Sequence, residues 1–182
     1  MSSTQRPTNA ALLGVATLVL VSFVGVSSAR AAGSPAATAL DVKARFAKQI
    51  AAVKRGTDIP VLLPASLPTM TSYRKLYLAG LHHPERWSVT IGAAPGCGSA
   101  TACFVASFAG RRGAVLARPN LRLPGGQRAR YLPIRCGASC GPASISFLHR
   151  DVLYDWRLKE PPPGGGKALA KLAGAAIAAS RP

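Results

Sequence analysis

The stretch SISFLHRDVLYDWRL, residues 144–158, decides the fold of this chain. Apolar residues recur at every second position on both sides of a central Arg150-Asp151 pair. They are Ile145 and Phe147 before the pair, and Val152, Tyr154 and Trp156 after it. A period of two is the pattern of a strand with one buried face. Two such strands separated by two residues predict an antiparallel hairpin.

The same alternation extends upstream of this hairpin. Trp87, Val89 and Ile91 alternate with polar residues in the segment 86–91, which predicts another half-buried strand. Further strands are expected at residues 73–79, 103–109, 121–123 and 130–134. Gly- and Pro-rich turn signals separate them, for example at residues 110–113 and 124–126. Short strands in close succession favour an antiparallel meander over a parallel sheet.

A helix is expected at each end of the region after residue 34. Residues 35–55 form an amphipathic pattern whose apolar face is Leu40, Val42, Phe46, Ile50 and Val53. Residues 167–180 are rich in alanine and follow the break PPPGGG at 161–166. The predicted fold class is therefore α+β: an antiparallel β-sheet meander with an N-terminal and a C-terminal helix packed on it. A membrane-surface or polymer-binding role for the first helix is the alternative.

The N-terminus has the pattern of an export signal. An uncharged, mostly apolar run at residues 10–26 follows Arg6, and Ala29-Arg30-Ala31 fits the small-x-small rule for cleavage. We therefore expect a signal peptide at 1–31 and a location in the periplasm or outside the cell. The alternative is a membrane anchor through residues 10–26, because more positive charge follows this run than precedes it. The rest divides into an amphipathic helix and linker at 32–57 and a disulfide-stapled β-rich domain with a C-terminal helix at 58–182.

Four cysteines form an even set, which in an exported chain predicts disulfides. Three pairings are possible. Loop-closure entropy favours a long cross-link, whereas Cys97–Cys103 and Cys136–Cys140 each lie where two predicted strands converge at a turn. We expect this local pairing. The spacings match zinc knuckles and C-x-x-C redox motifs poorly.

The chain is strongly basic. It has 23 Lys and Arg against 6 Asp and Glu, a net charge of +17, and residues 86–150 contain nine arginines and no acidic residue. Such a surface attracts anions. If several arginines share one sheet face with Tyr131, they form a site for an anionic envelope polymer. The candidates are Arg111, Arg112, Arg118, Arg122, Arg128, Arg130 and Arg135. The alternatives are an unknown protein partner and general basicity without a dedicated ligand, and nothing predicts specific reading of nucleic-acid bases.

Patterns typical of catalysis are few. No two of the six carboxylates are embedded in an apolar strand, and no nucleophile elbow, phosphate loop or H-E-x-x-H helix occurs. We therefore expect a non-enzymatic domain without a cofactor. The alternative is an exported metal-dependent enzyme that uses His82, His83 and Glu85, although adjacent histidines in an extended segment point apart.

The segments CGASCGPASISF (136–147), VLYDW (152–156) and LAKLA (169–173) resemble uncharacterised bacterial exported proteins with a small cysteine-containing β-rich domain. IPVLLP (59–64) and CFVASF (103–108) are similar to the same group, so the resemblance spans about residues 58–178. It implies an exported β-rich domain with paired cysteines. It implies no activity and no functional residues.

Overall fold

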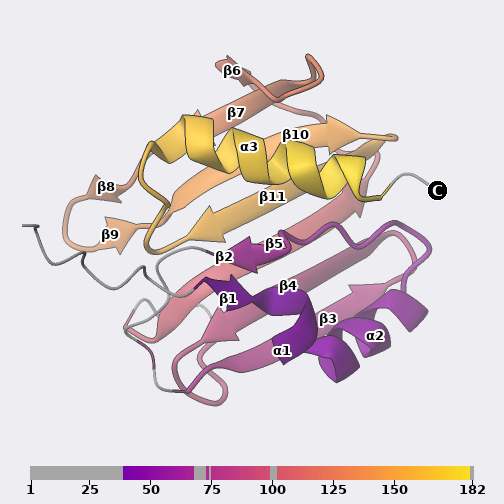
Figure 1. Ribbon diagram of the computed structural model, residues 1–182, viewed down its shortest axis with the longest axis vertical. Helices are drawn as coiled ribbons and strands as arrows, with labels where there is room; N and C mark the ends of the chain where they lie inside the picture. Colours follow the sequence, from indigo (N-terminus) through magenta and orange to yellow (C-terminus); the bar gives the residue numbers. More distant parts are fainter. Residues whose placement is uncertain (1–38, 68–72, 74, 99–101, 181–182) are drawn as a thin grey trace, which may run out of the picture. The chain divides into compact units, whose positions relative to one another are not determined.

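The computed structural model describes residues 39–67, 73, 75–98 and 102–180 (Figure 1). All of them belong to one compact unit, residues 35–182. The expected signal peptide at 1–31 and the alternative anchor at 10–26 lie outside the described residues. Within the part of the chain that the structure describes, no helix is both long and apolar enough to cross a membrane.

A seven-stranded antiparallel sheet forms the centre of this unit, with strand order β3-β4-β5-β11-β10-β7-β6. Its strands are β3 (Tyr77–His83), β4 (Arg86–Gly92), β5 (Phe104–Arg112), β6 (Leu121–Arg122), β7 (Arg128–Leu132), β10 (Ala143–His149) and β11 (Val152–Leu158). Two runs of consecutive strands meet where β11 pairs with β5 (Figure 1). The predicted α+β class with an antiparallel sheet is confirmed.

The hairpin of β10 and β11 forms where the sequence predicts it, with His149 opposite Val152. Arg150 and Asp151 both adopt positive φ, 51° and 61°. Positive φ at both central residues is the geometry of the two-residue turns whose twist matches that of the flanking strands. This turn therefore sets the register, and with it the face on which every apolar side chain of the hairpin lies.

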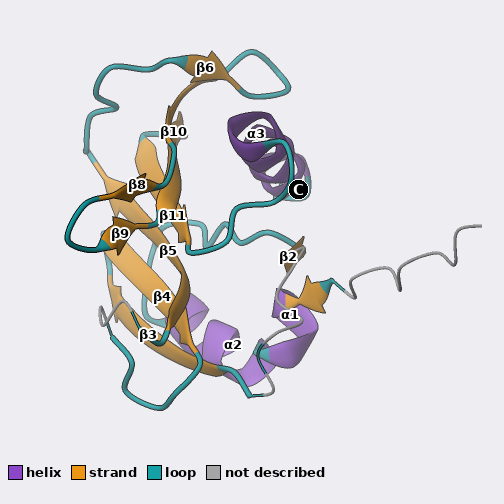
Figure 2. Cartoon of the chain, turned by 90° about the vertical axis from the view of Figure 1, so that its left-hand side faces the viewer, coloured by secondary structure: helices purple, strands orange, loops and turns teal. Residues whose placement is uncertain are grey.

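Three helices cover one face of the sheet, as Figure 2 shows. They are α1 (Val42–Arg45), α2 (Ala47–Arg55) and α3 (Gly165–Ala178). The short strands β1 (Leu40–Asp41) and β2 (Ser66–Leu67) pair on the same side. The helices bury the apolar positions that the sequence predicts, such as Ile50 and Val53 on α2 and Ala173 on α3. In the part of the chain that the structure describes, the architecture therefore has two layers, and no helix covers the other face of the sheet.

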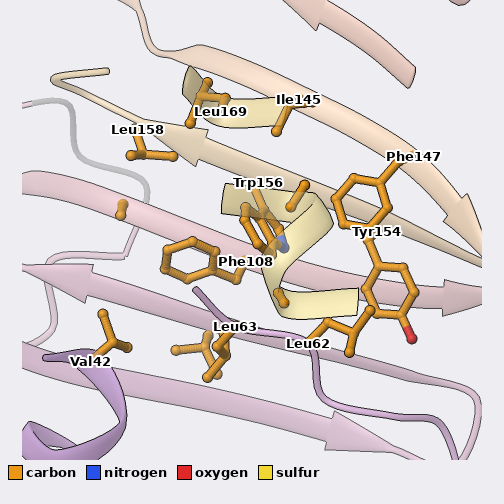
Figure 3. Packing of buried hydrophobic residues seen from close by; sticks show 14 of the residues in the cluster. Val42, Leu62, Leu63, Phe108, Ile145, Phe147, Tyr154, Trp156, Leu158 and Leu169 are labelled. Carbon is orange, nitrogen blue, oxygen red and sulfur yellow. The ribbon is translucent and has the colours of Figure 1, made fainter. Parts of the chain in front are cut away.

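Aromatic side chains fill the space between the layers (Figure 3). Phe108, Trp156 and Ile145 lie in one row across β5, β11 and β10. Trp156 packs edge-on against Phe108, with ring centroids 5.6 Å apart. In the next row Phe147 stacks on Tyr154, with centroids 5.4 Å apart. These rings bury large areas, so this is the part of the core that contributes most to stability.

The Pro60 carbonyl ties the segment between α2 and β2 to the sheet. It accepts hydrogen bonds from Tyr154 Oη at 3.0 Å and from Trp87 Nε1 at 3.2 Å. Gly110 lies beneath both rings, and a Cβ built there would be 2.6 Å from Trp87 Nε1 and 3.2 Å from Tyr154. Only glycine lets the two aromatic rings lie this close to the β5 backbone.

Two disulfides close short loops. Cys97–Cys103, with Cα atoms 5.8 Å apart, lies between β4 and β5. Cys136–Cys140, with Cα atoms 4.0 Å apart, joins β8 (Arg135–Cys136) to β9 (Cys140–Gly141), a small hairpin between β7 and β10. The pairing is the local one that the spacing predicts. Disulfides are typical of oxidising compartments outside the cytoplasm.

Several expected boundaries are wrong. The first helix begins at Val42 and is interrupted at Phe46, which has φ −120°, whereas the sequence predicts one helix over 35–55. The strand expected at 73–79 runs instead from Tyr77 to His83, so it includes His82 and His83. Gly110, expected in a turn, lies inside β5 because Trp87 and Tyr154 cover it.

Ionisation of the buried Tyr154 side chain should make the stability of the protein depend on pH in the alkaline range. Burial raises the pKa of Tyr154 from 10.0 to about 12, a rise that the nearby Arg150 charge reduces. Above pH 10 the unfolded chain loses this proton first. The free energy of unfolding therefore falls between pH 10 and 12, by about 2 kcal/mol from this group. Urea titrations at pH 9 and 11.5 should show this loss in the natural protein, and Tyr154→Phe should lack it. An equal loss in both proteins would contradict the assignment.

Candidate functional site

The face of the sheet without helices, here called the open face, has a floor of small polar side chains. Strand alternation that sends Trp87, Val89 and Ile91 to the core sends Ser88 and Thr90 to this face. Ser107 and Ala109 of β5 lie directly beside them in register. Because these side chains are short, they line a hollow of about 830 Å³ over β3, β4, β5 and β11. In Figure 2 this face is the left side of the sheet.

Two arginines lie directly opposite each other at one end of this hollow. Arg86 of β4 is the register partner of Arg111 of β5, and both side chains are exposed and line the hollow. His83 of β3 pairs with Arg86 on its other side. Like charges opposite each other on neighbouring strands destabilise a sheet by about 0.2–1 kcal/mol. Within the described residues neither guanidinium forms an ion pair that would offset this repulsion.

Asp155 supplies the carboxylate in the hollow, and both of its oxygens already accept hydrogen bonds from neighbouring side chains. Its Oδ1 accepts a hydrogen bond from Arg157 Nε at 2.7 Å, and its Oδ2 accepts one from Ser146 Oγ at 2.8 Å. Asp155 therefore offsets the charge of Arg157. The charges of Arg86 and Arg111 remain available for an anion, and each guanidinium offers five N–H donors.

A second group of arginines lies farther along the sheet. Arg130 of β7 is opposite Ser146 on the open face, and Arg128 follows the same alternation. Arg122 of β6 is opposite Arg128, and its Nη1 donates to the Gly126 carbonyl at 3.0 Å. Basic residues thus occur on β4, β5, β7 and β11 on one side of the sheet, and β6 adds Arg122 at its edge. An extended anionic chain could contact more than one of these groups.

Three of the sequence candidates do not join Arg111, Arg128 and Arg130 on the open face. Arg112 is the last residue of β5 and pairs with the buried Val152, so it lies on the helical side of the sheet. Arg118 lies in the loop before β6 with φ 44°, and Arg135 belongs to the separate β8–β9 hairpin. Arg122, the register partner of Arg128, lies on the same face at the β6 edge, where its guanidinium donates to the Gly126 carbonyl.

Tyr131 does not share a face with Arg128 and Arg130, so the condition set for a joint site with this tyrosine is not met. A Cβ built on Gly166 at the start of α3 would lie 2.8 Å from the Tyr131 ring. The ring therefore lies against α3, on the helical side of the sheet.

Two arginines that line the hollow, Arg86 and Arg157, are missing from the seven candidates chosen from the sequence. The signal was present in the sequence, because Arg86 precedes Trp87 and Arg157 follows Trp156, which places each on the face opposite a buried tryptophan. Arg86 belongs to the acid-free segment 86–150 and Arg157 lies outside it, and the period-two alternation alone predicts that both side chains face away from the core.

The two histidines considered for a metal site, His82 and His83, lie on opposite faces of the sheet. The His82 ring lies over Gly56 at the end of α2, on the helical side, whereas His83 lines the hollow on the open face. His83 Nδ1 accepts a weak hydrogen bond from the Glu85 amide at 3.5 Å. Among the residues that the structure describes, no three His, Cys, Asp or Glu side chains lie close enough together to hold a metal ion.

Comparisons with known proteins give no relative: no family model, no curated protein and no solved structure matches this chain.

Proposed function

We propose that the protein is an exported, non-enzymatic binding domain that holds an anionic polymer of the cell envelope against the open face of its sheet. The observation that carries this proposal is the Arg86–Arg111 pair. Two guanidiniums lie on adjacent strands, face a hollow, and form no ion pair within the described residues. An anion between them would replace repulsion by charge-assisted hydrogen bonds.

The shape and composition of the hollow favour an extended ligand over a small one. The hollow extends over four strands, with hydroxyl groups from Ser88, Thr90 and Ser107 on its floor. Such groups can donate to or accept from the hydroxyls or ester oxygens of a polymer. The arginines at Arg128 and Arg130 extend the basic surface along the sheet, and several weak contacts to one chain add up to useful affinity.

The recognised group is a phosphate or a carboxylate, and stacking on bases plays no part. Binding of single-stranded nucleic acid relies on aromatic platforms. Tyr77 is the one exposed Phe, Tyr or Trp side chain among the described residues, and it lies at the sheet edge. Both phosphate and carboxylate suit the flat fork of arginine, so the two must be separated by experiment.

The test is the affinity of the purified protein for inorganic polyphosphate, polygalacturonate and neutral dextran. Replacing both arginines, Arg86→Ala with Arg111→Ala, should weaken binding to at least one of the two anionic polymers by about tenfold or more, because each charge-assisted bond contributes about 1.5–3 kcal/mol. The matched control is Arg45→Ala with Arg55→Ala, which removes the same charge from exposed positions on α1 and α2.

The control pair should change affinity by less than about threefold, since it alters only the long-range field. All three proteins should bind dextran equally weakly. Equal losses in the two double variants would show that net charge alone drives binding, and would overturn the proposed site. A preference for polyphosphate or for polygalacturonate would identify the recognised group.

A further inference from the structure

Strand β3 ends the sheet with a long, regular edge. All seven of its residues pair with β4 on one side. Among the described residues no strand pairs with its other side. An edge strand carries a row of backbone N–H and C=O groups ready to pair with another strand. Proteins usually block such edges with lysine, proline, a bulge or a short strand. The sequence of β3, YLAGLHH, contains no lysine, arginine or proline, and its register with β4 is unbroken.

The opposite edge of the same sheet is blocked. β6 has only two residues and lies between Pro119 and Pro124. Beyond it the Asn120 side chain covers the backbone of β7: Nδ2 donates to the Tyr131 carbonyl and Oδ1 accepts from the Tyr131 amide, both at 2.8 Å. The contrast between the two edges indicates that the β3 edge is left open for pairing.

The β3 edge is also an uncharged, partly apolar strip in a chain of net charge +17. Leu81 is 74% exposed and Tyr77 38%, which makes them two of the four exposed large hydrophobic residues in the described part of the chain. Both point to the open face at this edge, since they alternate with the residues packed toward α2. A second copy of a protein this basic could approach most easily where no lysine or arginine meets its counterpart.

We propose that two copies of this chain pair antiparallel through β3, with a two-fold axis at Gly80. In this register Tyr77 lies opposite His83 and Ala79 opposite Leu81 on the open face, so each exposed apolar residue gains a cross-strand neighbour. Val53 of α2 packs over Gly80, and a Cβ built on Gly80 would be 2.6 Å from it, so the strand backbone at the axis is held in place. The two seven-stranded sheets then become one.

This pairing stands independently of the anion-binding proposal, but it would extend the basic surface. The open faces of both copies would lie on the same side of the joined sheet, because antiparallel pairing keeps residues of one face together. Each copy would contribute its own Arg86–Arg111 pair. A polymer long enough to reach both would bind more tightly than a short one.

The test is the molar mass of the purified protein by sedimentation equilibrium from about 1 µM to about 1 mM, a range that spans dissociation constants of about 1 µM to 1 mM for a small interface. We expect a monomer–dimer equilibrium. Leu81→Lys, and separately Ala79→Lys, should weaken dimerisation by about tenfold or more, because each places a charge opposite the partner strand. Val115→Lys is the matched control, since Val115 is 83% exposed but lies in the loop before β6.

Salt provides a second readout. Raising the ionic strength should strengthen the dimer, because it screens the repulsion between two basic copies. The same change should weaken anion binding, so the two proposals fail separately. A monomer at every concentration would overturn the β3 pairing. A dimer whose affinity is the same in Leu81→Lys, Ala79→Lys and Val115→Lys would overturn it as well.

Discussion

Trp156→Ala should lower the free energy of unfolding by about 3–5 kcal/mol. Trp156 has no exposed surface and lies between Phe108 and Phe147, with both rings edge-on at 5.6 and 5.5 Å. Truncation removes one of the two core tryptophans and leaves a cavity that neighbours on three strands cannot fill without moving. Urea unfolding followed by far-ultraviolet circular dichroism, with both disulfides intact, measures the loss.

Two variants separate the loss of volume from other effects. Trp156 Nε1 has no hydrogen-bond partner within the described residues, so Trp156→Phe removes volume alone and should cost about 1–2 kcal/mol. Leu153→Ala changes a half-buried residue on the open face of the same strand and should cost less than Trp156→Ala. A Trp156→Ala protein within 1 kcal/mol of the natural one would contradict the placement of this ring at the centre of the core.

Gly110→Val should destabilise the protein by about 3 kcal/mol, which is large for the addition of a small side chain. The new Cβ would meet Trp87 Nε1 and Tyr154, so at least one ring must move. Both rings donate to the Pro60 carbonyl. Moving them therefore weakens these hydrogen bonds and loosens the segment that joins α2 to β2.

Ala109→Val is the matched control for Gly110→Val. It adds a β-branched side chain at the neighbouring position of β5, which faces the open side of the sheet and not the aromatic rings. Because valine favours strands, the control should change the free energy of unfolding by no more than about 0.5 kcal/mol. Equal effects at the two positions, measured by the same urea titrations, would show that Gly110 is not a contact point for the rings.

Local patterns in the sequence predict the elements of this fold well, and their boundaries less well. The alternation around Arg150-Asp151 identifies the hairpin of β10 and β11, and the helical face of Ile50 and Val53 identifies α2. The sequence predicts a turn at Gly110, because a glycine has the same local pattern in a turn and beneath an aromatic ring. Its role depends on Trp87 and Tyr154, which reach it from other strands.

The periodicity of the sequence does not predict which strands pair with each other. The pattern shows which face of β5 is buried, but not that its neighbour is β11, the last strand of the chain. The candidate site depends on this order. Arg86 and Arg111 meet because β4 and β5 are adjacent in a fixed register, and Arg157 joins the same hollow because β11 inserts beside β5. The acid-free composition pointed to the basic surface, and the sheet order selects which of its arginines act together.

The most direct test of the binding proposal is the set of arginine side-chain Nε–Hε signals in ¹⁵N-labelled protein, followed while inorganic polyphosphate and then polygalacturonate are added. The signals of Arg86 and Arg111 should shift first and furthest with the polymer that binds, those of Arg128 and Arg130 should follow, and those of Arg45 and Arg55 on the helical side should stay near their starting positions. Shifts that spread equally over both sides of the sheet, or that centre on α1 and α2, would contradict an anion-binding site on the open face.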